Sequence, residues 1–174
     1  RALDDIYKRV IRDRRLHDDD AAAAERLSFD ALVYRSKKQV LHETMSGDIN
    51  SLGHQLNRFS ERNRHFRDFT LYSLISTIKE VIACFPVYRT YIGADGPDQT
   101  VSENDRRFID QAVQSAKRRG PAVTALVFDF VEQLLLKQTR ISSSEECEAR
   151  ARFIGKFQQI TSPVAAKGIE DTTF

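Results

Sequence analysis

Apolar residues recur at helical spacing from Leu71 to Phe85, and Pro86 follows directly. Their steps of three and four residues place them on one face of an α-helix. Thr70 can cap the start of this helix, and Pro86 stops it because proline has no backbone N–H to donate. Such a face is buried against other apolar stripes. The stripe consists of Leu71, Leu74, Ile75, Ile78, Val81, Ile82 and Phe85.

Other segments repeat this spacing, and together they predict a mainly α fold. Ser102 followed by Asp105 is a capping signature that opens one of them. Gly (7 residues) and Pro (4 residues), which long helices tolerate poorly, are scarce. We expect one helical domain over residues 1–174, with helical segments at 1–84 and 101–159. The other stripes begin near Leu3, Phe29, Ile49, Phe108, Val127 and Cys147.

Two stretches interrupt the helical pattern. Val87–Ile92 is rich in β-branched and aromatic residues, so residues 85–100 are predicted to form a strand and a loop. One strand cannot make a stable sheet alone, so this stretch either pairs with strands outside the chain or is itself a loop. Residues 160–174 show no helical stripe and are predicted to form an active-site-type loop, with a surface tail as the alternative. The predicted class is mainly α, with at most one or two short strands.

The charge balance argues against some classes of partner. The 27 Lys and Arg residues are nearly matched by 25 Asp and Glu residues, giving +2, whereas a dedicated nucleic-acid binder has a clear basic excess. No apolar run reaches the roughly 18 residues of a membrane span, and no signal peptide is visible. We therefore expect a cytoplasmic protein that binds neither nucleic acid nor membrane. Cys84 and Cys147 are expected to be buried free thiols, and no pattern indicates a metal or another cofactor.

Several segments resemble, in order and spacing, signature stretches of the maltooligosyltrehalose synthases, in the α-amylase clan of glycoside hydrolases. The two most specific are Phe85–Tyr91 and Lys167–Thr172. The similarity begins near residue 28 and continues to residue 174. The other similar segments are Lys38–Leu41, Asp48–Leu52, Glu61–Arg64 and Arg67–Thr70.

The resemblance implies that the chain is an internal helical segment of a (β/α)8-barrel enzyme. That family rearranges the reducing-end α-1,4 bond of a maltooligosaccharide into an α,α-1,1 bond by intramolecular transglucosylation, an isomerase reaction. Its retaining chemistry needs a carboxylate nucleophile and a carboxylic acid. By the resemblance, the catalytic carboxylates lie outside residues 1–174, so no catalytic residue is expected here and the segment alone should be inactive.

The implied partners are the maltooligosaccharide and the remainder of the barrel, and the isolated segment is expected to self-associate through the surface that the barrel covers. Three positions depart from the family, which commonly has Gly, Met and Ala at Ser162, Ala165 and Thr173. These departures concern fine substrate contacts, because none removes a charged group.

Five residues are the candidates for binding sugar or organising the site. The resemblance points to Lys167, Glu170 and Asp171, whose charged groups make strong hydrogen bonds to sugar hydroxyls. Arg89 and Tyr91 stand two residues apart, so on a strand they share one face. The alternative for all five is a structural role, as a salt bridge between the loop and the barrel.

Two hypotheses from other classes stay open. The helical stripes are equally typical of a protein-interaction module without carbohydrate chemistry, which predicts disorder for Lys167–Phe174 and no strand. A helical nucleic-acid binder would use the basic run Arg62–Arg67. The small net charge weighs against that second alternative, whose affinity would depend strongly on salt.

Overall fold

The computed structural model describes residues 29–93, 101–120, 123–140 and 143–173, without the side chains of residues 171–173. Within these ranges the chain forms six helices and no strand, so the predicted mainly α class is confirmed. The helix predicted near Leu3 lies outside the described residues, as do residues 94–100 of the predicted strand and loop. No helix in the described part is long and apolar enough to cross a membrane.

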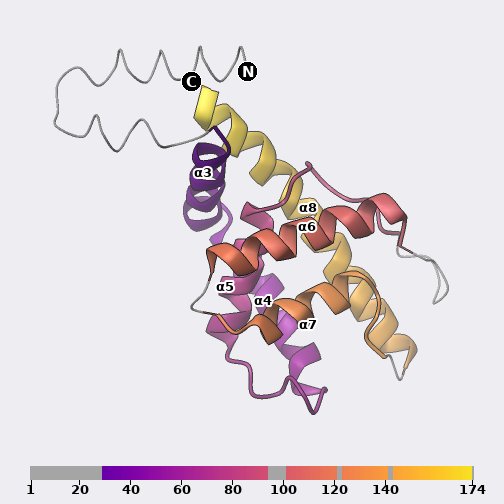
Figure 1. Ribbon diagram of the computed structural model, residues 1–174. Coiled ribbons are helices and arrows are strands. Elements are labelled where there is room, and N and C mark those ends of the chain that lie inside the picture. The colour runs from indigo at the N-terminus through magenta and orange to yellow at the C-terminus, as the bar shows by residue number, and fades with distance from the viewer. Residues whose placement is uncertain (1–28, 94–100, 121–122, 141–142, 174) are drawn as a thin grey trace.

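Helix α5 (Leu71–Ala83) is the centre of the fold (Figure 1). Its predicted cap is present, because Ser73 N donates to Thr70 Oγ1 at 3.1 Å. Leu74 and Ile78 are completely buried, and α5 contacts each of the five other described helices. The helix therefore buries the stripe that its sequence period predicts.

Helices α3 (Phe29–Glu43) and α4 (Ser46–Glu61) precede α5 and pack against it. Gly53 lets α4 approach α5 closely, since a Cβ at this position would lie 2.4 Å from Ile75 Cγ1. The buried apolar residues of the two helices are Val40, Leu41, Ile49, Leu52 and Leu56.

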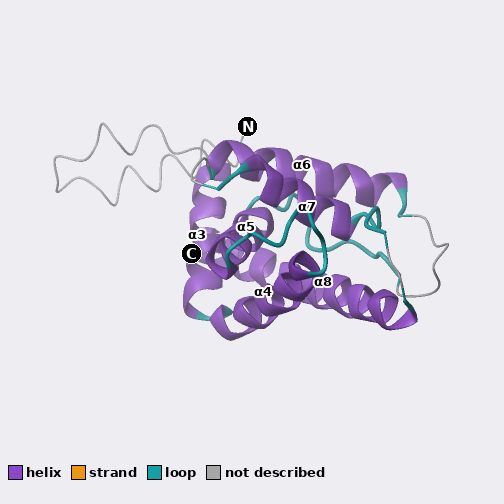
Figure 2. Cartoon of the chain, turned by 90° about the horizontal axis from the view of Figure 1, so that it is seen from below, coloured by secondary structure: helices purple, strands orange, loops and turns teal. Residues whose placement is uncertain are grey.

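Helices α6 (Glu103–Arg119) and α7 (Ala125–Leu135) lie on one side of the molecule, with α4 and α8 on the other (Figure 2). The capping signature that opens α6 is confirmed, because Asp105 N donates to Ser102 Oγ at 3.1 Å. Lys117 of α6 and Asp129 of α7 form an ion pair with 2.5 Å between Nζ and Oδ1. These contacts fix α6 and α7 side by side.

Helix α8 (Ser144–Thr173) corrects the prediction of a loop at residues 160–174, because the helix continues to residue 173. Pro163, which cannot donate to the preceding turn, lies on the exposed side of the helix. The second half of α8 does have a buried face, but small and polar residues carry part of its period. The buried residues of that half are Phe157, Gln158, Ile160, Thr161, Val164, Ala165 and Gly168.

Residues 85–93 follow α5 as an irregular segment, so the predicted strand at Val87–Ile92 is wrong. Ile92 N donates to Gln158 Oε1 at 2.7 Å, and Gln158 Nε2 donates to Ile92 O at 3.2 Å. One side chain therefore satisfies both backbone groups that a neighbouring strand would bond. Of the two options that the sequence left open, the described residues adopt the loop.

Candidate functional site

The irregular segment at residues 85–93 and the second half of α8 meet in a buried junction. The rings of Phe85 and Phe157 pack edge to face, with 5.6 Å between their centroids. Gln158, only 4% exposed, makes the two hydrogen bonds to Ile92 described above. The irregular segment and the middle of α8, 66 residues apart at Ile92 and Gln158, therefore share one packed core.

Lys37 of α3 completes this junction. Its Nζ donates to Phe85 O at 2.9 Å, and Gly168 packs directly on its stem. A Cβ at residue 168 would lie 2.5 Å from Lys37 Cγ and 3.3 Å from Lys37 Cα. Burial of the ammonium group lowers the pKa of Lys37 below its ordinary value of 10.5, because a charged group loses its hydration there. The junction thus contains a desolvated cation that joins three segments.

A polar cluster lies next to Lys37, where α3, α5 and the end of α6 meet. The Glu80 carboxylate accepts a hydrogen bond from Tyr34 Oη at 2.6 Å and one from Lys38 Nζ. The Arg119 guanidinium lies over the Tyr34 ring, 4.4 Å from its centroid. Burial, reinforced by the hydrogen bond to Glu80, raises the pKa of the Tyr34 hydroxyl. The cluster is arranged to hold helices together.

The two cysteines are free thiols as predicted, but they are half-buried rather than buried. Burial, followed by the negative charge of Glu80, raises the pKa of the Cys84 thiol to about 11. The thiol is therefore neutral at neutral pH, and a neutral thiol is a poor nucleophile and a poor metal ligand. Within the described residues, no group of three or more His, Cys, Asp or Glu side chains is placed to hold a metal ion.

Arg89 and Tyr91 stay together although no strand forms. The Arg89 Cζ lies 4.9 Å from the centroid of the Tyr91 ring, a cation–π contact. Tyr91 is 77% exposed, and nearby Tyr88 is 53% exposed. Among the described residues, Arg89 Nε is buried without a hydrogen-bond partner. The backbone N–H of Tyr91 donates to Asp105 Oδ1 at 3.4 Å, so the start of α6 supports the pair.

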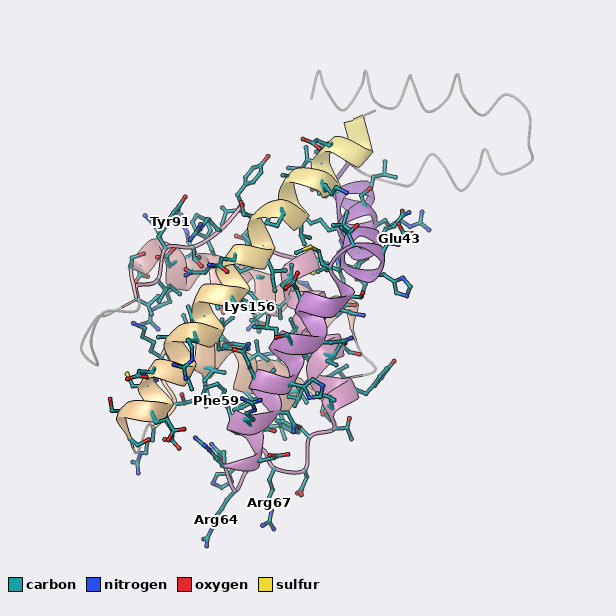
Figure 3. All side chains as sticks on the ribbon, turned by 180° about the vertical axis from the view of Figure 1, so that it is seen from behind. Glu43, Phe59, Arg64, Arg67, Tyr91 and Lys156 are labelled. Carbon is teal, nitrogen blue, oxygen red and sulfur yellow. The ribbon has the colours of Figure 1, made fainter. Side chains whose placement is uncertain are left out.

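The other three candidates lie near the end of α8. Lys167 and Glu170 are exposed and three residues apart, which places them on one helical face. Asp171 continues the helix, but its side chain lies outside the described part. No described contact joins these residues to Arg89 or Tyr91, so the five candidates form two groups. Figure 3 shows Tyr91 at the edge of the molecule beside the middle of α8.

The sequence analysis did not predict the buried residues that form the junction. Lys37 had a signal, because it lies three residues after Tyr34 and four before Leu41 and so falls on the inner face of α3. Gln158 had none, because its partner is a backbone group 66 residues away. A polar residue on an apolar stripe was therefore the only indication of a buried polar centre.

A separate pocket of about 560 Å³ lies between α6 and α7 and includes none of the five candidates. Burial raises the pKa of Glu132, with Lys117 opposing the shift and nearby Asp110 and Asp129 adding to it. Four carboxylates and two arginines line it, and one of the carboxylates, that of Asp129, is already paired with Lys117. The charged lining residues are Glu103, Arg106, Arg107, Asp110, Asp129 and Glu132.

The sequence matches no protein-family model, no curated protein and no solved structure. The junction combines exposed tyrosine rings and a stacked guanidinium with a buried layer of packed side chains beneath them. This combination suits the binding and positioning of a ligand more than the making or breaking of its bonds.

Proposed function

We propose that the chain is an internal helical segment of a cytoplasmic (β/α)8-barrel enzyme resembling maltooligosyltrehalose synthase. The observation that carries the proposal is the junction itself. The two stretches most specific to the resemblance, Phe85–Tyr91 and Lys167–Thr172, both contact Lys37: its Nζ donates to Phe85 O, and Gly168 packs on its stem. Segments with a common role in one site are expected to converge in this way, whereas unrelated surface segments are not.

The segment's role in the proposed enzyme is to hold the maltooligosaccharide rather than to cleave it. Exposed Tyr88 and Tyr91 offer ring faces to the apolar faces of glucose units, with hydroxyl tips for their polar edges. The Arg89 guanidinium, fixed over the Tyr91 ring, supplies donors for sugar oxygens. Lys167 and Glu170 provide a second polar row on α8.

The proposed reaction explains why such positioning groups are needed. In a retaining transfer, a carboxylate displaces the leaving sugar, and a second carboxyl group gives and then takes back a proton. The released glucose has to stay bound and turn, so that its anomeric hydroxyl attacks in place of water. Both carboxyl groups come from the rest of the barrel in this proposal, and residues 1–174 alone are inactive.

The test uses the full-length protein that contains this chain, with maltopentaose as substrate and the loss of reducing ends as readout. We expect activity in the full-length protein and none in residues 1–174 alone. Tyr91→Ala should lower kcat/KM about fivefold, since an aromatic contact is worth about 1 kcal/mol. Tyr72→Ala is the matched control, because Tyr72 is 80% exposed on α5 and lies outside the junction.

The helical protein-interaction module is the second candidate, and the missing strand at residues 87–92 favours it. Its other expectation, disorder from Lys167 onward, runs against the helix that continues to Thr173. A folded full-length protein that leaves maltopentaose unchanged would make this module the better account. Equal activity of Tyr91→Ala and Tyr72→Ala would remove the proposed sugar contact while leaving the enzyme class intact.

A further inference from the structure

A second pocket, of about 240 Å³, lies at the opposite end of α8 from the junction. It opens between the end of α4, the segment that follows α4, helix α7 and the first turn of α8. We call it the arginine pocket, because three arginines line it. Its polar lining consists of Arg62, Asn63, Arg64, Thr139, Arg140 and Glu146.

The charge of this pocket is unbalanced. The lining includes three arginines but one carboxylate, that of Glu146, which pairs with Arg62 at 3.4 Å between Oε1 and Nη1. Within the described part of the chain, neither Arg64 nor Arg140 has a carboxylate partner. Arg64 is exposed and projects from the end of the molecule at which α4 ends (Figure 3). Neither guanidinium is held by a carboxylate of the described residues, and that of Arg64 would turn back toward the pocket to reach an anion there.

Two further features add positive potential at the same place. Arg150, only 6% exposed, donates from Nη1 to Thr139 O at 3.2 Å, so it holds the wall of the pocket and places a buried cation behind it. The pocket also meets the start of α8, where Glu146 N donates to Ser143 Oγ at 3.2 Å. The N-terminal end of a helix carries a partial positive charge, which is favourable for an anion.

The floor of the arginine pocket is apolar and rigid. Phe130 and Leu134 of α7 are each 1% exposed, and the ring of Phe59 packs edge to face on Phe153 with 6.2 Å between centroids. A guanidinium rim over such a floor fits a ligand with one strongly anionic group and a less polar remainder. Arginine is suited to phosphate oxygens because its planar fork donates two parallel hydrogen bonds.

We propose that the arginine pocket binds the phosphoryl group of a small soluble molecule. Its small volume favours a small anion over a nucleic-acid strand, and the chain's net charge of +2 points the same way. This inference does not rest on the proposed function. The pocket residue Glu146 and the junction residue Gly168 lie on the same helix, about 33 Å apart at 1.5 Å rise per residue.

The probe is pyrophosphate, measured by calorimetric titration and by ³¹P NMR on the purified protein. Arg64→Gln and Arg140→Gln should each weaken pyrophosphate binding about tenfold, because each removes charge-assisted hydrogen bonds. Arg152→Gln is the matched control, since it removes the same charge from an exposed arginine on α8 that pairs with Glu148. We expect less than about a twofold change for this control, because exposed charges are well screened.

Glu146→Gln gives a test with the opposite sign. It removes the carboxylate that competes with the anion for Arg62, so pyrophosphate should bind several-fold more tightly. The proposal is overturned if pyrophosphate does not bind, or if Arg152→Gln weakens binding as much as Arg64→Gln and Arg140→Gln. It is also overturned if a single-stranded oligonucleotide binds more tightly than pyrophosphate and the same arginine variants weaken its binding. The site would then be a surface that binds polyanions.

Discussion

Helix α5 and the second half of α8 both bury one face, but they do so with different side chains. The face of α5 is mainly aliphatic, with Leu74, Ile78 and Val81 completely buried beside one buried threonine, Thr77. The face of α8 beyond residue 157 includes Thr161 and Gly168, and it packs against α3 over a buried lysine. Helix α5 is held in place mainly by the packing of large apolar side chains. The second half of α8 is held by its close packing on α3 and by hydrogen bonds.

This difference determines what each region tolerates. A loss of volume in α5 opens a cavity at the centre of the fold, because α5 contacts every other described helix. A gain of volume in the second half of α8 separates it from α3, because no space lies beneath Gly168. Variants that remove atoms from α5 and add atoms to α8 therefore test the comparison directly.

The largest effect is expected for Leu74→Ala in α5. This substitution should lower the free energy of unfolding by about 3 kcal/mol, the usual cost of a leucine-sized cavity in a well-packed core. Leu126→Ala is the control, because Leu126 is 58% exposed, and it should cost less than about 0.5 kcal/mol. Urea unfolding measures both, and similar values for the two variants would show that α5 is not the centre of the core.

A smaller loss is expected for Gly168→Ala in α8. Its Cβ would meet the Lys37 backbone, 3.2 Å from N and 3.3 Å from Cα, which cannot move aside as the end of a side chain can. We expect a cost of about 2 kcal/mol from this overpacking.

The matched control for Gly168→Ala is Gly155→Ala in the same helix. A Cβ at Gly155 meets no atom within 4 Å, so alanine should stabilise the helix by about 0.5 to 1 kcal/mol. The two substitutions are chemically identical and should shift the urea midpoint in opposite directions. If both variants stabilise the protein, α3 and α8 are not in close contact at residue 168.

The same contrast explains how much of the fold the sequence predicts. Large aliphatic residues at steps of three and four make the period of α5 visible, and Thr70 and Ser102 cap their helices as expected. In the second half of α8, a proline, three threonines and a glycine hide the period, although α3 provides a partner for that face. Packing against α3 stabilises the helical conformation of this half of α8, and a local sequence pattern does not show such a long-range contact.

The candidate site was predictable only in part. The segment at residues 85–92 was recognised as exceptional, but its strand-like composition could not show that Gln158 would take the place of a neighbouring strand. Tyr91 and Arg89 were paired for the wrong reason, since a cation–π contact joins them rather than a shared strand face. Long-range hydrogen bonds from a side chain to the backbone produce no periodic pattern in a sequence. The buried residues of the junction were therefore not predicted.

The smallest effect, and the most specific to the α8 side of the comparison, is a dependence of stability on pH that comes from Lys37. Burial holds the pKa of folded Lys37 below 10.5, its ordinary value. At neutral pH the lysine is charged in the unfolded chain, and burying that charge opposes folding. As pH rises through the folded pKa toward 10.5, the folded state releases a proton that the unfolded state still binds, so this lysine's contribution to stability increases.

Cys84 acts in the opposite direction, because burial raises the pKa of its thiol to about 11. As pH rises, the thiol ionises first in the unfolded chain, which lowers the free energy of unfolding. The difference between wild type and Lys37→Met largely cancels the cysteine, which both proteins contain. The wild type should therefore gain stability relative to Lys37→Met in urea unfolding series run from neutral pH upward. A difference that stays constant or reverses would mean that Lys37 is not desolvated beneath α8, and the two helices would then differ only in the size of their side chains.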